Sequence, residues 1–591
     1  MGSLPTTGSE YTPQSHHISI LQQVVEGRSA VDFLVRSYNR SFNGFAARIS
    51  SDEGHKISGM SKVVSVFPSK TLHFHTTRSW DFIGFTEDTK SSRTGESDVI
   101  IGVIDSGIWP ESESFCDQGF GPPPQKWKGQ CAGGENFICN NKIIGARFYD
   151  NDRSARDNIG HGSHTASIAA GNKVSRVSFY GMAKGNARGR APSARIAVYK
   201  PCDDSCSDQQ VLAAFDDAIA DGVDIITISL GGGYHQPFEN DAVAIGAFHA
   251  MEKGILTVHS AGNFASTIDR QIFDKIVLGN EKTLVGLGVN SFVMSGKFPL
   301  IFGSDSDKCA RNYDLDVFMS YFNSSQNPAA TIVRSEEIAD TAVPVVAAFS
   351  SQGPNFIAPD ILNPHIKAPG RYILPAFSLS ASPSGNPDDK RSLKYSILSG
   401  TSMACPHVTG AAVYVKSFHP DRSPSAIKSA LMTTASPMNA TEYYDREFAY
   451  GAGHLNPVKA VDPVMLCSMN NTHFGPCPPG TAVSPKDLNY PSMAIQATED
   501  KPFKIEFSRT VRNVGLSNST YKMEILASSQ SLDEKQSFVV TVDGQGLPVR
   551  SMASTSLVWS DGTCSVRSPI VVYTFGGPLN RMPSSLFIWH H

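Results

Sequence analysis

The spacing of apolar positions changes several times along the chain, and each spacing predicts a kind of element. Between residues 98 and 260, continuous runs of β-branched residues alternate with alanine-rich stretches of helical periodicity. We expect buried strands at residues 98–105, 195–199, 224–230 and 255–260, and helices at 207–220 and 241–253. Because strands that alternate with helices build a parallel, doubly wound sheet, this region predicts an α/β fold.

The pattern differs on both sides of that region. Ile18, Leu21 and Val25 recur at helical spacing and residues 63–67 form a short strand-like run, which predicts a small α+β unit. Residues 264–340 lose the rhythm and are expected to be irregular. Further helices are expected at 402–418 and 424–434, and short alternating strands at 503–507, 538–542 and 569–573. These late strands predict a C-terminal β-sandwich.

Length and charge exclude several classes of protein. A chain of 591 residues is too long for one ordinary core, so two to four domains are expected. With 51 Lys and Arg against 55 Asp and Glu, the net charge of −4 argues against nucleic-acid binding driven by positive charge. The sequence shows no apolar run long enough to span a membrane, and no secretory signal at its start.

The cysteines and glycosylation motifs favour an oxidising compartment. Cys116, Cys131 and Cys139 lie in polar, turn-rich stretches where disulfides often form, as do Cys202 and Cys206. A zinc site at the last two would need two more ligands at similar spacing, and none follows. Glycosylation motifs occur about as often as chance predicts, at Asn39, Asn323, Asn439, Asn470 and Asn518.

Three short motifs each end a predicted strand or open a predicted helix. Asp105 begins an Asp-Ser-Gly motif directly after the first buried strand, at the sheet edge where ligands and catalytic groups gather. His161 lies in a Gly-His-Gly-Ser-His motif that precedes good helix-forming residues. Ser402 lies in a Gly-Thr-Ser-Met-Ala-Cys-Pro-His motif, where a helix N-terminus would favour developing negative charge.

Taken singly, each motif has an ordinary structural explanation. An aspartate at a strand end is usually a cap or turn residue, and a serine at a helix start is commonly an N-cap. His161 and His164 could begin a metal site, but no third ligand can be assigned. Cys405 could be proposed as the nucleophile, but its place one turn into the helix predicts a small buried core residue.

Together the motifs predict nucleophilic catalysis. A serine hydroxyl needs an imidazole to remove its proton, and the imidazole needs a carboxylate to fix its tautomer. The chain order Asp105, His161, Ser402 is the order of subtilisin-type enzymes and not that of chymotrypsin or the α/β-hydrolases. Asn263, which follows the strand at 255–260, offers a side-chain amide for an oxyanion hole.

On these motifs the chain resembles the plant subtilisin-like serine proteases (subtilases), in particular their cucumisin-like group. The resemblance covers nearly the whole chain. It implies Ser402 as nucleophile, His161 as general base and then acid, Asp105 as orienting carboxylate and Asn263 as oxyanion donor.

The resemblance also implies how substrates bind. Ser229, Leu230 and Gly231 are similar to the family segment that pairs with the substrate backbone as an added strand. The expected partners are protein or peptide substrates and the chain's own propeptide, with no nucleic acid, no cofactor and no metal. The family's location is extracellular, in the apoplast or cell wall.

The family architecture implies a subtilisin-like doubly wound parallel sheet with three additions. These are an N-terminal α+β propeptide, a truncated protease-associated insertion and a C-terminal fibronectin-III-like β-sandwich. The expected boundaries are 1–75 for the propeptide, 76–289 and 341–470 for the two parts of the catalytic domain, 290–340 for the insertion and 471–591 for the sandwich. Autocleavage is expected after His75, before Thr76.

Several segments of the family pattern are missing. The chain begins inside what resembles the first propeptide strand, and the loop and strand expected after Asn263 are absent. The insertion is short between Cys309 and Tyr321, and a helix-bearing stretch is missing after residue 463. Loss of a core strand exposes a sheet edge, so we expect poor folding. The alternative to a protease is therefore a catalytically incompetent splice or gene-model variant that acts at most as a binding or regulatory protein.

Overall fold

A computed structural model describes most of residues 12–574, in two compact units, Met1–His73 and Phe74–His591. Outside the described residues lie 1–11, 67–78, 264–272, 288–295, 300–314, 333–343, 468–483, 575–591 and several shorter stretches.

The N-terminal unit is a small α+β fold, as the sequence predicts. Its helices are α1 (Pro13–Gln22), α2 (Ala30–Phe33) and α3 (Ser51–Ser58), and its antiparallel strands are β1 (Leu34–Tyr38) and β2 (Gly44–Ala47). Leu21 and Val25 are fully buried in its core. The strand expected at 63–67 falls mostly outside the described residues, and Val63 and Val66 belong to no strand.

A five-stranded parallel sheet forms the centre of the larger unit, in the order β4-β7-β3-β8-β9. Its strands are β3 (Ile100–Ile104), β4 (Ile143–Phe148), β7 (Arg195–Lys200), β8 (Ile225–Ile228) and β9 (Leu256–His259). Every residue of β3 and β7 is buried, because helices cover both faces of the sheet. The predicted α/β fold is confirmed.

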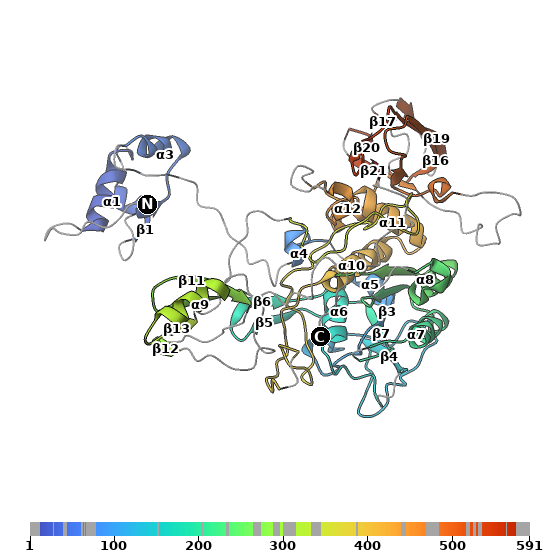
Figure 1. Ribbon diagram of the computed structural model, residues 1–591, viewed down its shortest axis with the longest axis horizontal. Coiled ribbons are helices and arrows are strands. Elements are labelled where there is room, and N and C mark those ends of the chain that lie inside the picture. The colour runs from blue at the N-terminus through green and yellow to red at the C-terminus, as the bar shows by residue number, and fades with distance from the viewer. Residues whose placement is uncertain are drawn as a thin grey trace, which may run out of the picture. The chain divides into compact units, whose positions relative to one another are not determined.

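Helices lie on both sides of the sheet (Figure 1), and two clusters of apolar side chains hold them there. On one face, Ile101, Val103 and Ile196 pack with α6 (His161–Ala170), α10 (Thr401–Phe418) and α11 (Pro424–Thr433). On the other, Ile100 and Ile226 pack with α7 (Asp208–Asp221) and α8 (Ala242–Glu252). The alternation of side chains along each strand supplies both clusters at once.

The expectation that residues 264–340 are irregular is wrong. They contain an antiparallel sheet, β11-β10-β13-β12, and one helix. The elements are β10 (Phe273–Leu278), β11 (Thr283–Leu287), β12 (Phe298–Pro299), α9 (Leu315–Ser324) and β13 (Ala329–Ile332). The missed signal is the β10–β11 hairpin, where two apolar runs flank the turn at Gly279. Strands β10 and β13 pair across the boundary expected at residue 290.

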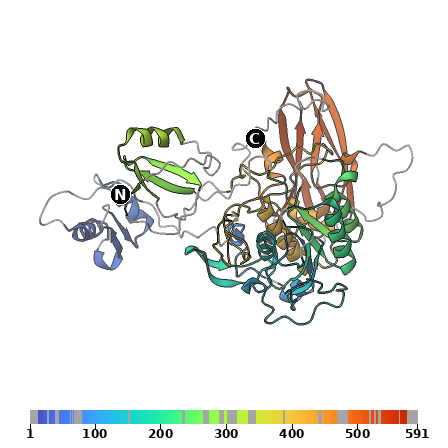
Figure 2. The ribbon, with the colours of Figure 1, turned by 60° about the horizontal axis from the view of Figure 1, so that its bottom comes forward.

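The C-terminal region has two sheets around one apolar core, as the sequence predicts (Figure 2, orange and red arrows). One sheet is β14-β16-β19 and the other is β15-β21-β20-β17-β18. The strands are β14 (Met465–Cys467), β15 (Met493–Gln496), β16 (Phe503–Asn513), β17 (Thr520–Met523), β18 (Ala527–Ser529), β19 (Lys535–Gly544), β20 (Met552–Ser560) and β21 (Ser565–Tyr573). Phe507 and Trp559 lie in the shared core.

Shorter elements complete the larger unit. They are α4 (Ser79–Phe82), α5 (Arg93–Asp98), α12 (Arg446–Tyr450), α13 (Pro457–Val461) and the hairpin of β5 (Val174–Phe179) with β6 (Met182–Ala187). Disulfides join Cys131 to Cys139 and Cys202 to Cys206, while Cys116 is free and exposed. The prediction of disulfides in these polar stretches is therefore confirmed for four of the five cysteines.

Candidate active site

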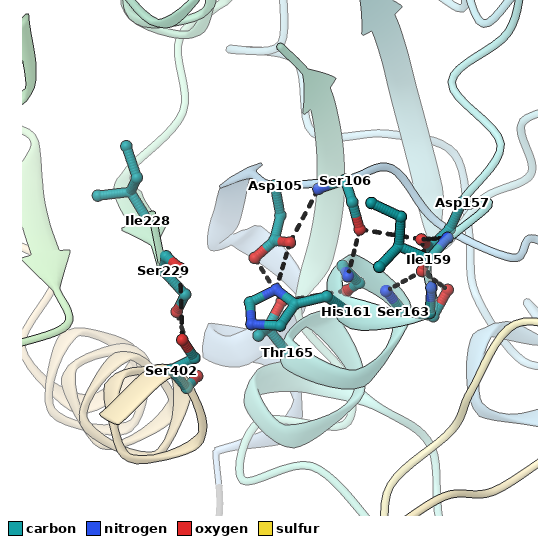
Figure 3. Close-up of polar contacts among 12 residues, drawn as sticks. Asp105, Ser106, Asp157, Ile159, His161, Ser163, Thr165, Ile228, Ser229 and Ser402 are labelled. Carbon is teal, nitrogen blue, oxygen red and sulfur yellow. Dashed lines mark hydrogen bonds and ion pairs between the residues drawn. The ribbon is translucent and has the colours of Figure 1, made fainter. Parts of the chain in front are cut away.

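Asp105 and His161 meet at the carboxyl end of the sheet. Asp105 follows β3, the central strand, and His161 is the first residue of α6. The Asp105 Oδ1 atom lies 2.7 Å from His161 Nδ1 (Figure 3). Asp105 is almost fully buried, whereas the His161 ring is partly exposed. Because the carboxylate accepts a hydrogen bond from Nδ1–H, the neutral imidazole keeps its proton on Nδ1 and a lone pair on Nε2.

Further donors fix the carboxylate of Asp105. The Ser106 backbone N–H donates to Oδ1 at 2.8 Å, and the Thr165 hydroxyl donates to Oδ2 at 3.1 Å. Thr165 belongs to the second turn of α6, so the helix that carries His161 also holds its partner. Hydrogen bonds to both oxygens fix the orientation of the carboxylate toward His161.

Ser402 is the second residue of α10, at the N-terminal end of a long buried helix. Its hydroxyl donates to the Ser229 carbonyl at 3.4 Å, and the Ser229 hydroxyl donates to the Ser402 carbonyl at 3.1 Å. Figure 3 shows His161 between Asp105 and the start of α10. The structure thus brings the three motifs together, with the Ser402 hydroxyl turned toward Ser229.

Asn263 lies beside Ser402 and is held by its neighbour. Its Oδ1 atom accepts from the Thr401 backbone N–H at 2.9 Å and from the Thr401 hydroxyl at 2.9 Å. This double contact occupies the amide oxygen and leaves Nδ2 as the donor of the side chain. Nδ2 also lies within 3.4 Å of the position that a Cβ on Gly400 would take.

The residues expected to pair with substrate follow β8. Ser229 is buried, Leu230 is partly buried and Gly231 is exposed. The Leu230 carbonyl contacts His259 Nε2 at 2.7 Å, which ties this segment to the end of β9. The neighbouring strand thus supports the segment from the side.

His164 and Cys405, which also belong to the motifs, are structural. His164 is fully buried with Nε2 on the Ser396 carbonyl, and burial holds its pKa well below the usual value. Cys405 is buried beneath the sheet, against the carbonyls of Ile228 and Val258, and burial raises its pKa. It is the core residue that the sequence predicts. Among the described residues, no three His, Cys, Asp or Glu side chains cluster as metal ligands would.

One residue of the site was missed by the sequence analysis. Asp157 is fully buried four positions before His161, and its carboxylate contacts both Ser106 and Ser163 (Figure 3). Helix α6 begins after Gly160, which has no side chain to cap the helix. An acidic residue shortly before an uncapped helix start is the signal that could have pointed to it.

Three protein-family models match the chain. The subtilase family matches residues 96–453, the fibronectin type-III domain matches 487–572 and the peptidase inhibitor I9 family matches 1–75. Among curated proteins, the chain is similar to the Arabidopsis thaliana subtilisin-like proteases SBT4.3 (48% identity) and SBT4.10 (49% identity). These alignments cover 97% of the chain in both cases, and 95% and 93% of the relatives.

The chain therefore belongs to the subtilase family. It is a serine peptidase of the subtilisin type that carries an N-terminal inhibitor domain and a C-terminal fibronectin type-III domain. Since the SBT4.3 alignment runs over 694 positions and the chain has 591 residues, that relative has internal segments without a counterpart here. Among the described helices, none combines the length and apolar character needed to cross a membrane.

Proposed function

We propose that this chain is the zymogen of an endopeptidase that hydrolyses peptide bonds through an acyl-enzyme on Ser402. In this proposal His161 is the general base and then the general acid, Asp105 orients it, and Asn263 donates to the oxyanion. The observation that carries the proposal is the 2.7 Å contact between Asp105 and His161 at the end of the helix facing Ser402.

The proposed reaction transfers protons through His161, while Asn263 contributes a hydrogen bond. His161 Nε2 takes the Ser402 hydroxyl proton as Oγ attacks the substrate carbonyl carbon. Asn263 Nδ2 then donates to the carbonyl oxygen, which has become negatively charged. His161 returns the proton to the departing amine, and the acyl group stays on Ser402. His161 then deprotonates a water molecule as its oxygen attacks the acyl carbon, and it returns that proton to Ser402 Oγ as the ester bond breaks and the acid leaves.

The attacking hydroxyl has to turn before this can happen, because it donates to the Ser229 carbonyl. That contact is long, at 3.4 Å, so little is lost when it breaks. A substrate that adds a strand along Ser229, Leu230 and Gly231 would offer a backbone N–H to the same carbonyl. Substrate binding and the turn of Ser402 toward His161 would then favour each other.

Activation is the second part of the proposal. Cleavage after His75 would release residues 1–75 from the catalytic domain; this bond lies outside the described residues. The I9 match over the same residues supports an inhibitory role before cleavage. We also propose that the enzyme is secreted, that its catalytic parts are 76–289 and 341–470, that 290–340 is a shortened protease-associated insertion, and that 471–591 is the sandwich.

The test is processing of the full chain in a secretory host, beside Ser402→Ala. Intact mass and N-terminal sequencing should show a new start at Thr76 in the parent only, and a fluorophosphonate probe should label the parent only. An unprocessed and unlabelled parent, produced as folded protein, would refute catalysis. That outcome would favour the alternative of a binding or regulatory protein.

A further inference from the structure

A buried carboxylate that no step above uses lies beside the candidate triad. Asp157 is fully buried, and its side chain accepts five hydrogen bonds. Oδ1 accepts from the Ser106 hydroxyl at 2.9 Å, the Ile159 N–H at 3.1 Å and the Gly160 N–H at 2.7 Å. Oδ2 accepts from the Ser163 N–H at 2.8 Å and its hydroxyl at 2.6 Å. Few side chains could replace a carboxylate surrounded by donors.

These donors come from two separate parts of the chain. Gly160 and Ser163 belong to the start of α6, so Asp157 caps the helix that begins with His161. Ser106 belongs to the loop after β3, next to Asp105. A carboxylate at a helix N-terminus also gains from the partial positive charge there. One side chain therefore joins the two segments that carry the proposed acid–base pair.

Ser106 is the junction between those segments. Its hydroxyl donates to Asp157 and accepts from the Gly162 N–H at 2.9 Å. Its own backbone N–H donates to Asp105 Oδ1 at 2.8 Å. Since Gly162 directly follows His161, the position of Ser106 sets the Asp105 carboxylate and the His161 backbone together.

A second serine closes the network on its other side. Ser163 donates its hydroxyl proton to Asp157 and accepts from the Trp109 N–H at 2.8 Å. Trp109 lies in the same loop as Ser106, so the loop is attached to α6 at two points. Burial raises the pKa of Asp157, and the bonds from Ser163 and Gly160 oppose this by stabilising the charge.

We propose that Asp157 is a positioning residue that sets the distance and angle between Asp105 and His161 through Ser106 and the start of α6. This inference rests on the proposed roles of Asp105 and His161. Asp157 does not touch substrate. It acts by holding the loop after β3 against the start of α6, and catalysis is sensitive to displacements of about 1 Å.

The first test is Asp157→Asn, measured on matured enzyme and on the full chain. An amide places an N–H₂ group against N–H or O–H donors whichever way it turns, so the network has to rearrange. We expect kcat to fall roughly 10- to 100-fold with KM changed less than about threefold. In the Ser402→Ala full chain, the downfield proton resonance of the His161 Nδ1–H bond should weaken or move.

Ser106→Ala tests the route of the effect. It removes the junction but leaves Asp157 capping α6, so the fold is less perturbed. We expect a smaller loss of kcat than in Asp157→Asn and a shift of the same resonance. The double variant should lose no more kcat than Asp157→Asn alone, because both changes break the same connection between Asp157 and Asp105. If Asp157→Asn is not produced as folded protein, Ser106→Ala decides the matter.

Asp221→Asn is the matched control. This buried aspartate of α7 accepts from Arg147 and Tyr199 and contacts no residue of the network. It should lower thermal stability while leaving kcat and the resonance unchanged.

The outcomes separate the inference from the proposed function. If the parent is active and Asp157→Asn keeps the parent's kcat and resonance, the positioning role alone is overturned. If only Ser106→Ala folds, the same result in that variant overturns it. An inactive parent whose His161 resonance still responds to Asp157→Asn would refute the proposed activity and support the positioning of the pair. An inactive parent with an unresponsive resonance would overturn both.

Discussion

Gly160 offers a sharp test of how tightly the site is packed. It precedes His161 with φ at +89°, a conformation that glycine adopts far more readily than other residues. A Cβ at this position would lie 2.3 Å from Cε2 of Phe377, whose side chain is buried. Gly160→Ala therefore combines backbone strain with a steric clash, directly beside the proposed general base.

Backbone strain and steric overlap both lower the free energy of unfolding of Gly160→Ala. An alanine held in the left-handed region costs about 1–2 kcal/mol. Forcing a methyl group into a filled space costs about 1–3 kcal/mol more, because Phe377 or the backbone has to move. The total is about 2–5 kcal/mol. The entropy of unfolding is about 2.1 cal/mol/K per residue, so for a unit that spans residues 74–591 this corresponds to a fall in Tm of about 2–5 °C.

Gly119 provides the matched control. Its φ of +85° is nearly the same, it is exposed, and a Cβ there would meet nothing within 4 Å. Gly119→Ala should therefore cost only the strain, about 1–2 kcal/mol, with kcat unchanged. Gly160→Ala should lose a further 1–3 kcal/mol and roughly 100-fold in kcat if His161 moves by about 1 Å.

Thermal melts should be recorded on the Ser402→Ala full chain, which cannot cleave itself, and kcat on the matured enzymes with an amide substrate. The reasoning is refuted if the two alanine variants lose the same stability and both keep parental kcat. That result would mean that Phe377 yields at no cost and that the start of α6 is not fixed by packing.

Other parts of the larger unit give further predictions. Glu96→Gln removes the ion-pair partner of the buried Arg190 guanidinium, which keeps its contacts with the rings of Phe85 and Tyr414, and should cost about 3–5 kcal/mol in unfolding free energy. Glu96→Leu with Arg190→Met should recover most of this loss. Burial lowers the pKa of Lys142 to about 7. Between pH 7 and about 10.5, the unfolded chain therefore binds one more proton at this side chain than the folded chain does. The free energy of unfolding should rise with pH in this range by up to ~1.4 kcal/mol per pH unit. In melts taken across this range, Lys142→Met should reduce the slope by up to this amount, whereas Lys428 and Lys367, whose burial lowers their pKa values to about 7 and about 8, keep their own contributions. Asn263→Ala should lower kcat about 100- to 1,000-fold, the cost known for such a donor in subtilisin, with a smaller change in KM. A parent-like kcat would exclude Asn263 as an oxyanion donor.

Sequence reasoning succeeded where one segment carries its own signal. The run of β-branched residues over 98–105 needs no partner to be read as a buried strand, and β3 lies there. The capping box at Ser207 and the left-handed Gly222 mark the ends of α7 almost where periodicity predicts them. The three motifs were placed correctly because each sits at the end of such an element.

It failed where the meaning of a residue depends on partners far along the chain. The uncapped start of α6 is a local signal for Asp157, but the link of Asp157 to the loop that carries Asp105 runs through Ser106, 51 residues earlier, and no local pattern predicts it. The sheet formed by β10 and β13 joins segments more than 50 residues apart, with other elements between them. The turned hydroxyl of Ser402 depends on the Ser229 carbonyl, 173 residues away.

The order of the parallel sheet divides the site into two halves of unequal local stability. Asp105 follows β3, which has a strand on each side, whereas Asn263 follows β9, which pairs within the described part of the chain only with β8. An edge strand can separate from its sheet without disturbing the centre, so backbone amides near Asn263 should exchange with solvent faster than those near Asp105. Transient opening of that edge would take away the oxyanion donor while the aspartate and histidine stay in place. The enzyme would then alternate between competent and incompetent forms without any change in its acid–base pair.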